Sequence, residues 1–293
     1  MRARPAQALP AAPLAAAAAL TACSAGTPPA STAPRAAGAD PGVAHVHGLG
    51  VDPADGVLYA ASHHGLFRIP EQGPATRVAD RYQDTMGFTV AGPGTFLGSG
   101  HPDARKDPDL PPRLGLIRST DRAETWQSVS LLGKVDFHAL QAAHGNVYGW
   151  DAGSGDVMVS ADGGRTWDVR SRLAVRDLVV SPDDPDELLV TTEQGPARSR
   201  DGGRTWERVP DAPLLAVLTW AAPASLFGVA PSGRVHRSSD GGDTWTASGE
   251  VGGQPEAATA DPDGGELYVA VADRGVLVSG DGGRTFTVRY AAA

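Results

Sequence analysis

Histidine and carboxylate side chains gather in the first half of this 293-residue chain. Six of its eight histidines fall between residues 45 and 138, close to several aspartates and a methionine. Imidazole is the commonest metal ligand in proteins, and carboxylate and thioether groups extend the set. Three or four such groups suffice for Zn²⁺ or a copper ion. The candidate metal or ligand-binding residues are His47, His63, His64, His101, His138, Asp84, Asp103, Asp136 and Met86.

A less specific interpretation of the same residues stays open. The chain has no CxxC or HExxH motif that would sharpen a metal prediction. Histidines that only bond to carboxylates and backbone groups in a polar channel would give the same composition. Which interpretation holds depends on whether the fold brings these residues together.

The element that must position them is a repeat. Five stretches are nearly identical: STDRAETW (119–126), SADGGRTW (160–167), SRDGGRTW (199–206), SSDGGDTW (238–245) and SGDGGRTF (279–286). Their aspartates are Asp121, Asp162, Asp201, Asp240 and Asp281. A period near forty, with short strands between turns, is typical of β-propeller blades. Asp-Gly-Gly favours a tight turn in which glycine adopts positive φ and the aspartate accepts backbone N–H groups.

The segments between these turns predict an all-β propeller with four-stranded antiparallel blades. Alternating Val, Leu and Ala are separated by Gly, Pro and Asp turns, and no segment reads as a long amphipathic helix. GLFRIPEQGPAT (65–76) aligns with GLIRSTDRAETW (115–126) and supplies a sixth, decayed copy of the turn. Six blades are expected, with seven as the alternative count. Their ranges are 43–80, 81–130, 131–172, 173–210, 211–250 and 251–290.

Propeller geometry then predicts where the histidines lie. Loops that enter first strands and loops that join second to third strands share one face around the central channel. His47, Met86 and His138 begin the first strands of consecutive blades, and His63, His64 and His101 follow second strands. We therefore expect a His/Asp-rich face over blades one to three. A charged, Pro-rich insertion in blade two (101–115) is expected to overhang it.

The start of the chain predicts export and anchoring. Residues 1–23 combine a basic head, an Ala/Leu-rich run and a lipobox-like Leu-Thr-Ala-Cys, which is typical of a signal peptide. Cys23, the only cysteine, is the expected lipidation site, so the protein would be held by lipid on the outer face of the bacterial cell membrane. Residues 24–42 read as a flexible linker and 43–290 as one propeller domain. A net charge of −9 argues against nucleic acid as a partner.

The repeated octapeptide resembles the Asp-box, or BNR repeat, of sialidase-like propellers. Beyond the repeats, HGLGVDP, HHGLF, MGF, GSGHPD, GLIRSTD and VDFHAL resemble a family of bacterial exported propellers that carries the automatic name glycosylhydrolase. Related Asp-box propellers include photosystem II assembly factors and sortilin-like receptors, which bind proteins and do not cut glycans. The resemblance implies Asp-box hairpins between third and fourth strands, away from the ligand-binding face.

Three functions remain open at this point. The leading one is a lipid-anchored propeller that binds a ligand or metal ion at the histidine face. The second is a sialidase-like glycoside hydrolase, because Phe67-Arg68-Ile69-Pro70 is similar to the F/Y-R-I-P motif whose arginine grips a substrate carboxylate. Arg68, however, aligns with Arg118, Arg198 and Arg237, which indicates a repeat position, and no convincing set of catalytic residues can be assembled. The third is a non-catalytic platform for protein interaction or assembly.

Overall fold

The computed structural model describes residues 40–261 and 264–292. The predicted signal peptide, Cys23 and most of the predicted linker lie outside the described residues. Asp40, the first of the described residues, forms an ion pair with Arg77. None of the described helices is long and apolar enough to cross a membrane.

The described residues form six four-stranded antiparallel sheets, each made of consecutive strands. The first two blades are β1 (Val46–Val51), β2 (Leu58–Ser62), β3 (Gly65–Ile69), β4 (Thr76–Arg77), and β5 (Asp84–Gly92), β6 (Thr95–His101), β7 (Leu116–Ser119), β8 (Gln127–Ser130). The next two are β9 (Phe137–Ala143), β10 (Asn146–Asp151), β11 (Asp156–Ser160), β12 (Asp168–Arg172), and β13 (Asp177–Val180), β14 (Leu188–Thr192), β15 (Gly195–Ser199), β16 (Glu207–Arg208). The last two are β17 (Val217–Ala222), β18 (Ser225–Val229), β19 (Arg234–Ser238), β20 (Thr246–Glu250), and β21 (Pro255–Ala260), β22 (Leu267–Val271), β23 (Gly275–Ser279), β24 (Thr287–Ala291).

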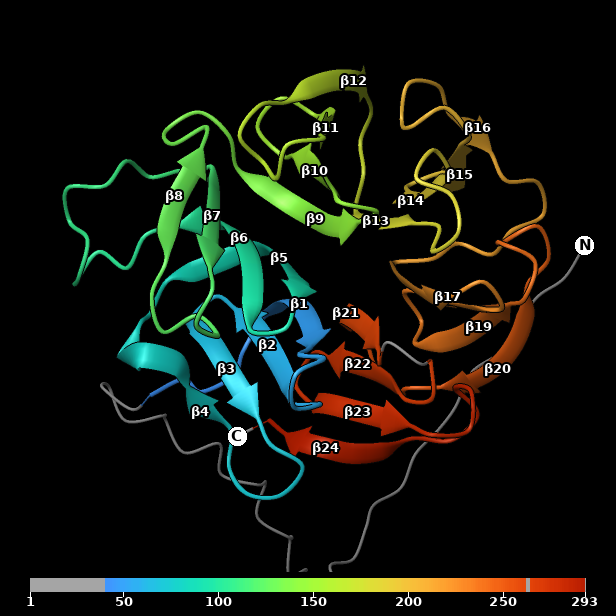
Figure 1. Ribbon diagram of the computed structural model, residues 1–293. Coiled ribbons are helices and arrows are strands. Elements are labelled where there is room, and N and C mark those ends of the chain that lie inside the picture. The colour runs from blue at the N-terminus through green and yellow to red at the C-terminus, as the bar shows by residue number, and fades with distance from the viewer. Residues whose placement is uncertain (1–39, 262–263, 293) are drawn as a thin grey trace, which may run out of the picture. The chain divides into compact units, whose positions relative to one another are not determined.

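This arrangement is a six-bladed β-propeller, so the predicted fold class is confirmed. Figure 1 shows the first strands β1, β5, β9, β13, β17 and β21 towards the centre and the fourth strands at the outside. Each described strand falls inside its predicted blade range or within one residue of it. The one helical element in the described residues is the short 3₁₀ turn η1 (Val78–Asp80), which follows blade one.

The position of a strand within its blade explains its composition. Second strands are covered on both faces by neighbouring blades, so they are apolar along most of their length. Leu58–Ser62 and Leu267–Val271 are buried throughout. Fourth strands face solvent on the outside, and Asp168–Arg172 and Thr287–Ala291 are mostly exposed. The blades are thus held by apolar side chains of their middle strands, which leaves the first strands free to carry polar groups.

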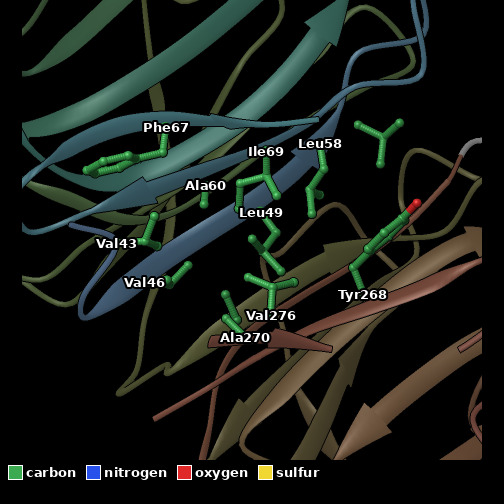
Figure 2. Close-up of a cluster of buried hydrophobic side chains, with 12 residues drawn as sticks. Val43, Val46, Leu49, Leu58, Ala60, Phe67, Ile69, Tyr268, Ala270 and Val276 are labelled. Atoms are coloured by element: carbon green, nitrogen blue, oxygen red, sulfur yellow. The ribbon is translucent and has the colours of Figure 1, made fainter. Parts of the chain in front are cut away.

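Apolar clusters fill the seams between neighbouring blades. One joins blade one to blade six, where side chains of β1, β2 and β3 pack against Tyr268, Ala270 and Val276 (Figure 2). The same seam carries a hydrogen bond from the backbone N–H of Val46 to the Glu256 carboxylate, at 3.0 Å. Among the described strands no sheet takes a strand from another blade, so side-chain packing closes the ring here.

The five repeated turns join third to fourth strands, as their resemblance to the Asp-box implied. We call these five turns, which contain Asp121, Asp162, Asp201, Asp240 and Asp281, the Asp hairpins. In one of them Asp162 accepts the backbone N–H of Arg165 and of Thr166 and the hydroxyls of Ser160 and Thr166. These hydrogen bonds to Thr166 and Ser160 hold the pKa of Asp162 well below its usual range. The carboxylate is therefore committed to its own turn.

Arg68 lies on the third strand β3 and pairs across the sheet with Tyr59 of β2. It is not among the residues that line the central channel. The arginines at the equivalent repeat positions form hydrogen bonds between blades. Arg118 donates to the Gly163 carbonyl oxygen of the next blade, and Arg198 donates to that of Gly241. The position of Arg68 agrees with its interpretation as a repeat-position residue.

Candidate functional site

A channel of about 460 Å³ runs between the first strands of all six blades. Residues at the beginnings of these strands share one mouth, because the first strands run in the same direction along the channel. His47, His138, Asp177 and Glu256 occupy such positions and line the cavity. Farther along the strands the lining residues are uncharged, among them Thr89, Gln141 and Thr219, so the ionisable groups are concentrated at the mouth.

The first cluster at the mouth joins blades one and two. Asp84 begins β5, His47 lies on β1, and His63 lies in the turn between β2 and β3. The Asp84 carboxylate lies 3.4 Å from Nε2 of His47 and 2.9 Å from Nδ1 of His63. One donor atom from each residue fits within 4.8 Å of the others, the spacing of a three-ligand metal site. We call these three residues the first cluster.

Two buried atoms of the first cluster have no hydrogen-bond partner. Nε2 of His47 and Oδ1 of Asp84 are buried, face each other and make no hydrogen bond. Most buried polar groups in folded proteins are hydrogen-bonded, and each exception requires a physical explanation. The His63 side chain is 54% exposed, so the cluster is open to solvent on one side. A bound cation that enters from that side would satisfy both orphaned atoms.

A second cluster joins blades two and three. His101 ends β6, Asp136 precedes β9, and His138 is the second residue of β9. Oδ2 of Asp136 lies 3.6 Å from Nε2 of His101 and 3.2 Å from Nε2 of His138. Burial opposes ionisation of Asp136, but the hydrogen bond from His138 and the positive charge of both imidazoles lower its pKa overall. Oδ1 of Asp136 is buried without a partner. We call these three residues the second cluster.

The remaining predicted residues lie apart from these clusters or beside them. Asp103 is 2% exposed, and its carboxylate is already bonded. It accepts the backbone N–H of Tyr82 and forms an ion pair with Arg105. His64 lies next to His63, with 4.9 Å between the ring centroids. Burial, and then the nearby charges of His63 and Arg77, lower the pKa of the His64 imidazole. Met86 is half-buried on β5, two residues after Asp84.

The insertion at 101–115 packs back onto the rim of blades one and two. Its Asp107 forms an ion pair with Arg81, and Lys106 donates to the carbonyl oxygen of Ala79 at 2.7 Å. The carbonyl oxygen of Pro112 lies 2.6 Å from Nδ1 of His101, within the second cluster. The insertion therefore contacts a candidate ligand directly.

Sequence reasoning did not single out Asp177 of blade four. Its carboxylate accepts the N–H of Leu178 and of Leu218, the latter in the next blade. Desolvation nevertheless raises its pKa to about 6. The available signal was its place at the start of a first strand, the same place that Asp84 holds in blade two. In blade six the Glu256 carboxylate accepts the backbone N–H of Val46 and lies 3.7 Å from Nδ1 of His45.

Comparison with solved structures returns propellers of several activities. The GH74 enzyme of Niastella koreensis aligns with a TM-score of 0.59 and 17% identity, over 85% of this chain and 46% of its own. A gluconolactonase of Xanthomonas campestris aligns with a TM-score of 0.62 and 16% identity, over 79% of this chain and 84% of its own. A chain of a nidogen/laminin complex gives 0.59 and 14%, over 79% and 92%. Identities this low show the fold alone.

The chain spans less than half the length of the GH74 enzyme that it matches. No curated protein sequence matches it. A family profile does match, over residues 118–287, which is more than half of the chain and includes the five Asp hairpins up to the start of the last strand. The chain therefore belongs to the BNR-repeat family described as photosynthesis system II assembly factor YCF48.

Proposed function

We propose that this protein is a non-catalytic, extracytoplasmic binding propeller that holds a divalent transition-metal ion on His47, His63 and Asp84. The observation that carries the proposal is the pair of orphaned atoms, Nε2 of His47 and Oδ1 of Asp84, buried 3.4 Å apart. An unpaired buried polar group costs about 1–3 kcal/mol, and a cation between the two atoms removes that cost.

The spacing of the ligand atoms supports the same ion. Zinc lies about 2.0–2.2 Å from imidazole nitrogen and carboxylate oxygen, so neighbouring ligand atoms around it are separated by about 3.0–3.5 Å. The observed separations are 3.4 Å between Nε2 of His47 and Oδ1 of Asp84 and 2.9 Å between Nδ1 of His63 and Oδ2, and one ligand atom of each residue lies within 4.8 Å of the others. Two imidazoles and one carboxylate suit Zn²⁺ or Cu²⁺. Three protein ligands leave a position open on the solvent side, which suits reversible binding of the ion or of a further ligand.

Calorimetric titration of the exported chain with Zn²⁺ at pH 7.5 tests this proposal. We expect saturable binding and a higher melting temperature, because an ion that binds only the folded state stabilises it by mass action. His63→Ala removes one half-exposed ligand and should lower the affinity at least about 100-fold, equivalent to about 2.7 kcal/mol. Asp109→Asn changes an exposed carboxylate of the insertion and serves as the matched control. Equal affinity in wild type and His63→Ala would refute the assignment.

Anchoring through a lipid on Cys23 is part of the same proposal. The lipobox-like Leu-Thr-Ala-Cys and the Ala/Pro/Ser/Thr segment 24–42 support a membrane-tethered protein outside the cell membrane. Metabolic labelling with a fatty-acid analogue should mark the wild type and not Cys23→Ser. Cell fractionation should release the variant from the membrane fraction, and retention of an unlabelled Cys23→Ser chain there would contradict the anchor.

A protein-binding role is the second candidate, because the family to which the chain belongs is described as an assembly factor. The insertion offers an exposed apolar residue, Leu110, at the rim. A photo-crosslinking residue at position 110 should capture one discrete partner in the native host. The same probe at the outer-strand residue Val169 is the control. Identical crosslinking patterns from both positions would argue against a specific partner at the insertion.

Glycoside hydrolysis has less support. The glycoside hydrolases among the similar structures share only the fold with this chain. Arg68, the residue that suggested a sialidase, lies on a third strand and not in the channel wall. Turnover of a fluorogenic sialoside that disappears in Arg68→Ala would overturn this view, whereas equal inactivity of both proteins would support it.

A further inference from the structure

The second cluster is built like the first, one blade further along. In the first cluster a histidine that follows a second strand, His63, meets a carboxylate that begins the next blade, Asp84. In the second cluster His101 ends a second strand and meets Asp136, which begins the following blade. A third ligand comes from a first strand in both cases, His47 or His138. The two seams thus present the same donor set, two imidazole nitrogens and one carboxylate.

A hydrogen bond orients the His101 ring. The Pro112 carbonyl oxygen can only accept, so the Nδ1 atom 2.6 Å away carries a proton and donates it. The other ring nitrogen, Nε2, faces Oδ2 of Asp136 at 3.6 Å, which is longer than a hydrogen bond. A carbonyl bond to one ring nitrogen is a usual way in which proteins orient an imidazole whose other nitrogen binds a metal ion.

We propose that His101, Asp136 and His138 form a second transition-metal site, separate from the first cluster and oriented by the insertion of blade two. Oδ2 of Asp136 lies 3.2 Å from Nε2 of His138, a separation found between neighbouring ligands of a zinc-sized ion, and 3.6 Å from Nε2 of His101, which is slightly longer. The orphaned Oδ1 of Asp136 is a second, independent observation that points to a missing partner. His101 is 42% exposed, which leaves a route for the ion. Unlike those of the first cluster, the three ligand atoms do not all lie within 4.8 Å of one another, so the half-exposed His101 ring has to move inward and weaker binding is expected.

Stoichiometry measured with Zn²⁺ alone tests this site separately from the proposed function. The exported chain is compared with Asp84→Asn, Asp136→Asn and the double variant by calorimetry and by metal analysis after desalting. We expect two ions per chain in the wild type, one in each single variant and none in the double variant. The weaker of the two binding events should be the one that disappears in Asp136→Asn.

His101→Ala guards against a folding defect, because Asp136 is largely buried whereas His101 is half-exposed. It should lower the affinity of the weaker event at least about 10-fold, because loss of one of three ligands removes about 1.4 kcal/mol or more. His144→Ala, a histidine outside both clusters, should leave both events unchanged.

The outcomes separate the two proposals. One ion that is lost only in Asp84→Asn, with His101→Ala like the wild type, would overturn the second site and leave the first. One ion that is lost only in Asp136→Asn and His101→Ala would establish the second site and refute the first. No bound ion in the wild type would overturn both.

Discussion

The Asp hairpins and the histidine clusters use the same carboxylate group in opposite ways. In the hairpins Asp162 has both oxygens bonded to donors of its own turn, and its four counterparts repeat the arrangement. At the channel mouth Asp84 and Asp136 each keep one buried oxygen without a partner. The hairpins are repeated in five blades, whereas the clusters occur only at the seams of blades one, two and three.

This difference separates stability from binding. A carboxylate that is fully satisfied by nearby backbone groups stabilises a turn and has nothing left to offer a ligand. A carboxylate that is buried but incompletely bonded costs free energy, which a bound cation would offset at the sites that we propose. We therefore expect substitutions in the hairpins to change folding, and substitutions at the clusters to change affinity.

The largest folding effect is expected for Gly164→Ala in the third blade's hairpin. Gly164 has a φ of +88°, and an added Cβ would lie 2.0 Å from Cδ2 of the fully buried Leu116. Positive φ and overpacking together should cost about 3 kcal/mol. Chemical denaturation should show the loss, and Gly280→Ala, where an added Cβ meets nothing, serves as control. An unchanged midpoint in Gly164→Ala would mean that the seam tolerates more volume than its packing indicates.

Ser160→Ala and Asp84→Asn test the comparison directly, because one should change stability and the other zinc affinity. Ser160 is buried and accepts the N–H of Gly164 while it donates to Asp162, so its loss should cost about 1–2 kcal/mol of unfolding free energy. Asp84→Asn keeps the shape of the side chain and should change that free energy by less than about 1 kcal/mol in chelator, because the ion pair with His63 that it removes is partly exposed to solvent. Zinc affinity should fall at least about 100-fold in Asp84→Asn, or about 2.7 kcal/mol, and not in Ser160→Ala. A large loss of stability in Asp84→Asn without metal would break the distinction.

The pH dependence of the unfolding free energy should include opposite contributions from Asp177 at the channel mouth and from the carboxylates of the Asp hairpins. Asp177 has a pKa of about 6 in the folded protein and about 4 when unfolded, so the folded state binds more protons between these values. The unfolding free energy contributed by Asp177 should therefore fall by about 2 kcal/mol as pH rises from 4 to 7. The hairpin carboxylates, whose pKa values are lowered, contribute stability above pH 4 that is lost on acidification.

Denaturation of wild type and Asp177→Asn at several pH values isolates the channel contribution. Relative to the variant, the wild type should be more stable at pH 4 than at pH 7. The hairpin carboxylates are common to both proteins and cancel in the difference. Parallel pH profiles would show that water in the channel solvates the Asp177 carboxylate.

The smallest effect is expected where the hairpin of blade two departs from the repeat. Ala123 stands where blade three has Gly164, and it adopts a φ of 68°. Ala123→Gly relieves the positive φ, worth about 1 kcal/mol, but removes a buried methyl group worth about 0.8 kcal/mol. The free energy of unfolding, measured by thermal denaturation, should therefore change by less than about 0.5 kcal/mol. A clear gain in stability would show that backbone strain, and not packing, dominates at this position.

The sequence predicted the fold more completely than the candidate site. Local turn chemistry recurs with each hairpin, so the period of Asp121, Asp162 and the others, together with the decayed copy at 65–76, predicted six four-stranded blades, with seven as the alternative count. The grouping of the site residues depended on contacts across seams. Asp103 is in the sequence neighbourhood of His101, yet it turns back to Tyr82 and Arg105. Asp177 was overlooked because nothing in its local sequence indicates that neighbouring strands desolvate it.

The sequence by itself determined the blade number, the strand order within a blade and the face on which the histidines emerge, because these follow from local turns and from the alternation of side chains along strands. The tertiary structure alone decided that four of the six histidines and two aspartates become two separate clusters, at the seams of blades one and two and of blades two and three. The physical reason is that each cluster joins residues from different blades, and their separation is set by apolar packing between the blades and not by distance along the chain.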